Sequence, residues 1–194
     1  MLSAPVIGQE TPSNPDLSAF IDSLKDEDQH WRNRLTKKRN GEIDTLSEPR
    51  LINEVNKADK RHYPLIIKVF LDYGYPSQSL VGDASAHNYW LLVQHQDHQT
   101  QFQEKILIAM KGLLDGGLVS LTDYAYLVDR VNINKGEKQV YGTQMELNSE
   151  KTSYICKPVL EPDSLDARRK SMGLPPIDFY INSMNELYHG NLNK

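Results

Sequence analysis

The spacing of apolar residues changes once along the chain, and this change limits the folds that the chain can adopt. Apolar residues from Leu17 to Leu24 recur at the three- and four-residue intervals of an amphipathic helix. Helical patterns continue to Val128, after which apolar and polar residues alternate as they do in strands. The sequence therefore predicts a mainly helical α+β fold with a small antiparallel β-meander in its C-terminal third.

Breaks in the helical pattern divide it into separate helices. The turn-forming sequence RNGEID at 39–44 separates the first two, and Gly74 and Pro76 end the second. Pro64 either begins a new helix or kinks the second one, and 79–82 is expected to be a linker. Ser120 and Asp123 have the spacing of a capping box. The expected helices cover 16–32, 51–70, 84–94, 102–114, 120–128, 165–172 and 177–188.

The alternating region is expected to form three strands. These cover 131–133, 139–147 and 152–157, with turns at 134–137 and 148–151. Gly142 interrupts the middle strand, which indicates a bulge or a close approach of another part of the chain to its backbone.

The size and charge of the chain favour one globular domain and argue against a nucleic-acid partner. The 194 residues suit a single core, and we expect a flexible N-terminal arm over 1–15 followed by one domain over 16–190. The net charge is −4, and no stripe of Lys and Arg forms a surface for phosphate. The densest basic run, 32–39, is interpreted as a solvated helix face.

Cellular location is predicted from features that the sequence lacks. Cys156 is the only cysteine, so no intrachain disulfide can form, which fits a reducing compartment. No apolar run reaches the roughly 20 residues that cross a bilayer, so no membrane partner is expected. A cytoplasmic protein is the first expectation. The alternative is an exported protein in which the small residues before Gln9 are the remnant of a trimmed export signal.

The densest polar cluster is Gln94-His95-x-Asp97-His98, at a predicted helix end. A histidine there can titrate near neutral pH, and a nearby carboxylate can orient it for acid–base catalysis. The structural alternative is that Asp97 caps the next helix and His95 bonds the last carbonyls of the helix before it. His-x-Asp could also bind a divalent metal, but the usual zinc spacings are absent, so no metal ligand is assigned.

Two further polar groups follow, each with a functional and a structural interpretation. Arg130, next to Asp129, offers a planar fork of donors for a carboxylate or phosphate, or the two residues tie helix to meander. Gln139, Tyr141 and Gln144 could hold a polar substrate, because glutamine both donates and accepts hydrogen bonds. Alternatively they form a network that joins the sheet to the helices.

The order of these motifs resembles a widespread bacterial family that is catalogued only as a domain of unknown function. The resemblance covers about residues 20–185 and draws attention to positions without implying any reaction. Asp59 becomes a candidate only through it. The matching elements are DQHWR at 28–32, Asp59, DYGYPSQSLVG at 72–82, QHxD at 94–97, DRV at 129–131, YGTQ at 141–144 and LDARRKSMGLPPIDFY at 165–180.

These observations lead to two functional hypotheses. The first is a small-molecule enzyme, with hydrolysis as the leading reaction, in which catalysis falls to His95, Asp97 and Asp59. Its polar substrate would be bound by Gln94, Arg130, Gln139, Tyr141 and Gln144. The second is a non-catalytic module that binds a ligand or a protein, with the polar cluster as a structural network. No cofactor and no oligomeric state can be assigned. The first hypothesis requires that the sheet edge, the end of the 84–94 helix and the helix of Asp59 meet at one pocket.

Overall fold

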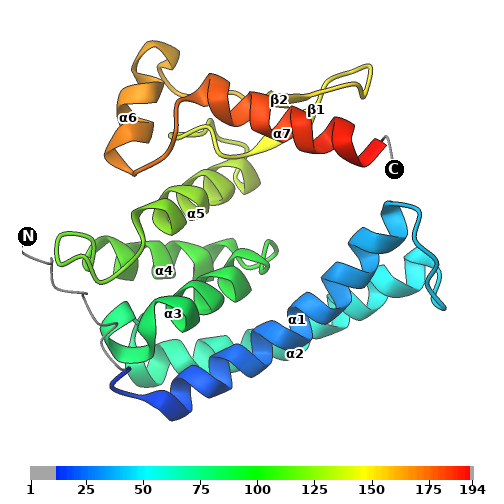
Figure 1. Ribbon diagram of the computed structural model, residues 1–194. Coiled ribbons are helices and arrows are strands. Elements are labelled where there is room, and N and C mark those ends of the chain that lie inside the picture. Colours follow the sequence, from blue (N-terminus) through cyan, green and yellow to red (C-terminus); the bar gives the residue numbers. More distant parts are fainter. Residues whose placement is uncertain (1–11, 193–194) are drawn as a thin grey trace, which may run out of the picture.

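A computed structural model of the chain describes residues 12–192 and confirms the mainly helical α+β fold (Figure 1). The helices are α1 (Pro15–Arg39), α2 (Glu48–Tyr73), α3 (Gln78–Gln94), α4 (Thr100–Lys111), α5 (Leu121–Asn134), α6 (Leu165–Ser171) and α7 (Ile177–Leu192). The strands are β1 (Met145–Leu147) and β2 (Tyr154–Cys156), and a 3-10 turn, η1 (Pro162–Ser164), leads into α6.

The elements are arranged in successive layers (Figure 1). Helices α1 and α2 form a long antiparallel hairpin, and α3 packs against both. Helices α4 and α5 pack on each other, and α5 also contacts α3. The β-hairpin, α6 and α7 form the last layer, on the far side of α5 from the α1–α2 hairpin (Figure 1). The main core runs between α1–α2 and α5 and includes Ile21, Ile66, Tyr89, Ile106 and Leu127.

Local sequence signals explain where the first two helices begin and end. The Asn14 side chain accepts a hydrogen bond from the backbone N–H of Leu17, and Pro15 occupies the first helical position of α1. Basic residues fill the last turn, where they interact favourably with the helix dipole. Gly74 ends α2 with φ +71°, which a residue with a side chain rarely adopts.

The structure decides two expectations about helix continuity. Helix α2 is continuous through Pro64, so Pro64 does not begin a new helix, and buried residues on both sides of it, Ala58 and Ile66, belong to one helix. The proposed linker at 79–82 is helical over 79–81, within the first turn of α3, and is interrupted at Gly82. Only Gly82 leaves the helical conformation, at φ +80°, and it kinks α3 there.

The predicted meander is smaller than expected. Among residues 12–192, the sheet is a two-stranded antiparallel hairpin in which Met145 pairs with Cys156 and Leu147 with Tyr154. The strand predicted at 131–133 was wrong, because α5 continues to Asn134. Burial of Leu127 and Val131, four residues apart, outweighs the local alternation.

Residues 139–144 form a loop instead of the expected strand. We call this segment the 139–144 loop. Gly142 lies in it with φ +66°. A Cβ atom at Gly142 would come within 3.2 Å of Cys156 Sγ and of Ile177 Cδ1. The expected close approach to the Gly142 backbone is therefore confirmed.

Most of the predicted N-terminal arm, residues 1–11, lies outside the described residues. Next to it, the backbone N–H groups of Ser13 and Asn14 donate to the carbonyls of Ser79 and Leu80. Within the described part of the chain, no helix combines the length and apolarity needed to cross a membrane.

Candidate functional site

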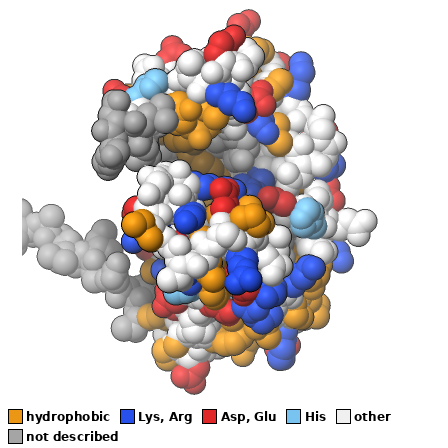
Figure 2. All heavy atoms as spheres, turned by 90° about the vertical axis from the view of Figure 1, so that its right-hand side faces the viewer, with side chains coloured by type: hydrophobic (Ala, Val, Ile, Leu, Met, Phe, Trp, Pro, Cys, Tyr) orange, Lys and Arg blue, Asp and Glu red, His pale blue; other side chains and the backbone are white. Residues whose placement is uncertain are grey.

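A cavity of about 710 Å³ lies where α1, α2, the α3–α4 connection and α5 meet. Its charged and titratable lining consists of Arg32, Asp59, Lys60, His95, Asp97, His98 and Arg130. Amide and aromatic side chains also line it, from Asn56, Tyr63, Gln96 and Gln99. Figure 2 shows one face of the molecule that is hollowed across its middle, with acidic and basic side chains side by side near the hollow.

His95 directly follows the last residue of α3, Gln94, and lines the cavity. The buried Gln103 of α4 donates from Nε2 to the carbonyls of Val93 and Gln94, which satisfies backbone groups that a helix end leaves free. The His95 ring is 12% exposed. Its Nδ1 lies 3.1 Å from Oδ1 and 3.0 Å from Oδ2 of Asp28.

Asp28 is the carboxylate that orients His95, whereas the sequence hypothesis named Asp97 and Asp59 as the catalytic carboxylates. It lies on α1 and its side chain is 1% exposed. It also accepts from Arg32 Nε and from Gln29 Nε2, each at 2.8 Å. Burial raises the pKa of Asp28, but the hydrogen bonds and charges of His95 and Arg32 outweigh burial and leave the pKa below its ordinary value.

A signal in the sequence could have identified Asp28. Leu17, Ile21 and Leu24 form the buried stripe of α1, and Asp28 continues the stripe at helical spacing. A carboxylate on the apolar face of a helix must find donors. Arg32, four residues further along, is one of them.

Arg32 links Asp28 to Asp59. Its Nη2 donates to Asp59 Oδ1 at 2.5 Å, so one guanidinium joins α1 to α2. Burial raises the pKa of Asp59, and the ion pair with Arg32 only partly offsets this effect. The structure thus brings Asp59 and His95 to the same cavity, as the sequence hypothesis required.

Asp97 faces Arg130 across the same cavity. Arg130 donates from Nε to Asp97 Oδ1 at 2.6 Å and from Nη2 to Oδ2 at 2.7 Å, and Asn134 donates to Oδ1 at 3.0 Å. Burial raises the pKa of Asp97. These donors lower the pKa by more, so the net shift is downward. The capping interpretation was wrong, since the side chains of Asp97 and His95 bind Arg130 and Asp28 instead of helix ends.

The remaining sequence candidates lie away from the cavity lining. The Gln94 carboxamide oxygen is buried, with no hydrogen-bond partner in the described part of the chain. Gln139 is fully buried and pins the 139–144 loop to β2, with Nε2 bonded to the carbonyls of Gln144 and Lys157. Tyr141 packs in a small apolar cluster. The sheet edge therefore does not line the cavity.

Asp129 and Arg169 both bind the backbone of the 139–144 loop. Both side chains are fully buried. The Asp129 carboxylate accepts three backbone N–H groups of the loop at 2.7 to 2.9 Å. Arg169 Nη1 donates to the carbonyls of Tyr141 and Gly142 at 2.7 and 3.1 Å. Adjacent residues of the DRV motif thus point to different places, Asp129 to this loop and Arg130 to the cavity.

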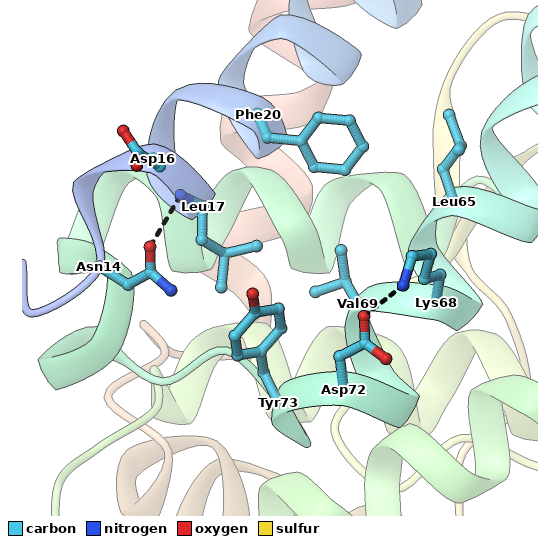
Figure 3. A pocket seen from close by; sticks show the side chains of 9 residues that line it. All are labelled: Asn14, Asp16, Leu17, Phe20, Leu65, Lys68, Val69, Asp72 and Tyr73. Carbon is cyan, nitrogen blue, oxygen red and sulfur yellow. Dashed lines mark hydrogen bonds and ion pairs between the residues drawn. The ribbon is translucent and has the colours of Figure 1, made fainter.

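Within residues 12–192, no three His, Cys, Asp or Glu side chains are grouped so that they could hold a metal ion. A second cavity of about 410 Å³ lies between the first turns of α1 and the end of α2 (Figure 3). Its polar groups bond locally: Asn14 caps α1, and Lys68 pairs with Asp72 at 2.6 Å. Apolar side chains such as Phe20 supply much of its remaining wall.

Comparisons with known proteins define the family but add no activity. Neither the curated proteins nor the solved structures contain a match to this chain. A model of a family of unknown function (DUF6624) matches residues 15–193, which include every residue of the cavity lining. The chain therefore belongs to this family.

Proposed function

We propose that the protein is an enzyme that uses His95 as a general acid and base on a small polar substrate, with hydrolysis as its reaction. The observation that carries this proposal is the bond from His95 Nδ1 to the buried Asp28, on a ring that faces a cavity. A neutral imidazole that donates from Nδ1 has its lone pair on Nε2. Nε2 is then the atom that can take a proton from a substrate or a water molecule.

Water is the nucleophile that this site favours. Among the described residues that line the cavity there is no Ser, Thr or Cys to form a covalent intermediate. In the proposed step, water gives a proton to Nε2 of His95, and its oxygen bonds to the electrophilic carbon or phosphorus. The bond to the leaving group breaks with its electron pair, and the leaving group takes the proton from Nε2. Asp59, which accepts a hydrogen bond from Arg32 in the wall of the same cavity, is the second acidic group that the proposal places beside the substrate.

Replacement of His95 by Gln tests this proposal. We expect turnover on a panel of chromogenic esters, amides and phosphate esters to fall about 100- to 10,000-fold, because general acid–base catalysis contributes on this scale. The melting temperature should stay nearly unchanged, since Gln can still donate to Asp28. His30→Gln is the matched control, because His30 is exposed on α1 and outside the cavity lining.

Two results would count against the enzyme. Undiminished turnover in the His95→Gln variant contradicts the role of His95. If no panel member is turned over and His95→Gln strongly lowers the melting temperature, the rival is favoured. The rival is a non-catalytic ligand- or protein-binding module whose polar cluster is a structural network.

A further inference from the structure

The two arginines of the cavity use the same edge of their guanidinium groups for internal pairing. Arg130 binds Asp97 side-on through Nε and Nη2. Arg32 likewise uses Nε for Asp28 and Nη2 for Asp59. Within the described part of the chain, Nη1 of neither arginine donates a hydrogen bond.

This pairing fixes each guanidinium plane and leaves its far end available. A planar guanidinium end offers parallel N–H donors that match the oxygens of a carboxylate or phosphate. Carboxylates that already hold the side chain in place reduce the rotamer entropy lost on binding. Arg32 and Arg130 are each 26% exposed, so solvent and ligand can reach them.

Three cations and three carboxylates lie in or behind the described cavity wall, so the case for an anion rests on donors that these carboxylates leave unused. Arg32, Lys60 and Arg130 face the carboxylates of Asp59 and Asp97. Lys60 forms no ion pair with any described residue. Asp28 carries a further negative charge behind His95, but it is 1% exposed and its oxygens are already bonded to His95, Arg32 and Gln29.

We propose that this cavity binds a small molecule with an oxyanion group, a carboxylate or a phosphate, at the Nη1 ends of Arg32 and Arg130, with Lys60 at the same site. The bound group would place the rest of the molecule beside His95. That the bound molecule reacts at His95 rests on the proposed function. Binding of the anion can be measured without turnover.

The test uses inorganic phosphate and acetate as probes, titrated against sodium chloride of equal ionic strength, with heat of binding and melting temperature as readouts. We expect at least one of the two anions to bind and to raise the melting temperature above that in chloride. Binding of phosphate alone identifies a phosphate-bearing substrate, and binding of acetate alone a carboxylate. Binding of both supports the shared oxyanion chemistry.

Variants locate the anion in the cavity. Arg130→Lys keeps a cation beside Asp97 but removes the planar end, and should weaken binding about tenfold. Lys60→Gln disturbs no ion pair recorded among the described residues and should weaken binding severalfold. Lys57→Gln is the matched control: this lysine, on the same helix, pairs with Glu54 outside the cavity lining and should leave binding unchanged.

The proposal is overturned if neither anion binds beyond the chloride control, or if Lys60→Gln binds both as tightly as the unaltered protein. His95→Gln separates this result from the proposed function. It should bind the anion normally while losing turnover. Anion binding with turnover intact in that variant would contradict the enzyme mechanism and leave the anion site supported.

Discussion

Asp28 shows how one residue determines the geometry of the site. It lies on the core-facing stripe of α1, yet carries a charge and accepts hydrogen bonds from His95, Arg32 and Gln29. A buried charge is tolerated only when donors surround it. Asp28 therefore fixes Nδ1 as the His95 nitrogen that is bonded within the protein, and it also holds the guanidinium that reaches Asp59.

Asp28→Asn should change how stability depends on pH. Because the folded-state pKa of Asp28 is lowered, its contribution is present above the unfolded value of about 3.9 and is lost as pH falls through the lower folded value. The variant should lose roughly 3 kcal/mol of unfolding free energy at neutral pH. As the pH falls from about 5 to about 2, the unfolding free energy of the variant should decrease less than that of the unaltered protein.

Urea denaturation at a series of pH values measures this difference. Asp26→Asn is the control, because Asp26 is 74% exposed and pairs with Lys25 at the surface. Equal stability losses and equal pH slopes in the two variants would contradict the role given to Asp28.

Among the elements, helices α3 and α5 are joined by an ion pair outside the cavity. His87 Nδ1 of α3 lies 2.9 Å from Asp123 Oδ2 in the first turn of α5, and the His87 ring stacks on Trp90. The hydrogen bond from Asp123 raises the His87 pKa above its ordinary value. The contact therefore strengthens on protonation.

His87→Gln should remove a small pH-dependent part of the stability. The raised folded pKa means that the contribution is fully present below the unfolded value of about 6.5 and is lost as pH rises through the folded value. The His87 side chain is 52% exposed, so solvent limits the effect to a few tenths of a kcal/mol. Calorimetric melting at pH 5.5 and pH 8.5 should show a smaller difference in the variant. If the variant and the unaltered protein show the same difference between the two pH values, His87 does not contribute to the pH dependence of stability.

The helices and strands also show which elements could be predicted from the sequence. The helices around the core were predictable because burial imposes a 3.6-residue period that residue types reveal, as in Leu17, Ile21 and Leu24. The helical structure of 131–133 was not predictable, since alternation over three residues fits a strand as well as the last turn of a helix. Contacts with residues distant in sequence decided that this segment is helical.

The structure brings together only some of the residues that the sequence singled out, and it adds a contact between distant segments that the sequence did not predict. His95, Asp97 and Asp59 were singled out and meet at one cavity. Asp28 and His95 are separated by 67 positions, and nothing local in either motif indicates their contact. Gln139, Tyr141 and Gln144 resemble a binding set in composition, but their environment is a structural loop.

At the scale of the whole molecule, the C-terminal layer is attached to the helical layers through the 139–144 loop. Asp129 of α5 binds the N–H groups of this loop, and Arg169 of α6 binds its carbonyls. Arg169 Nη2 is buried with no partner in the described part of the chain, and the guanidinium lies over the Tyr180 ring. Two opposite buried charges thus stabilise one stretch of backbone.

Arg169→Lys should loosen this attachment. A lysine ammonium cannot reproduce the planar fork that bonds several carbonyls, so the unfolding free energy should fall by roughly 3 kcal/mol. Hydrogen exchange should accelerate first at the amides of residues 140–143 and then across β1 and β2, with α1 unaffected. Lys170→Arg, at an exposed neighbouring position, is the control. Acceleration spread evenly over all helices would contradict a local attachment.

The placement of the cavity residues has a consequence for biosynthesis. Every side chain that lines the cavity precedes residue 131, and Asn134, which supports Asp97, closes α5. The described residues that line the site are therefore all synthesised before β1. Residues 135–192 add no lining group, and the 139–144 loop ties their layer to α5 through Asp129.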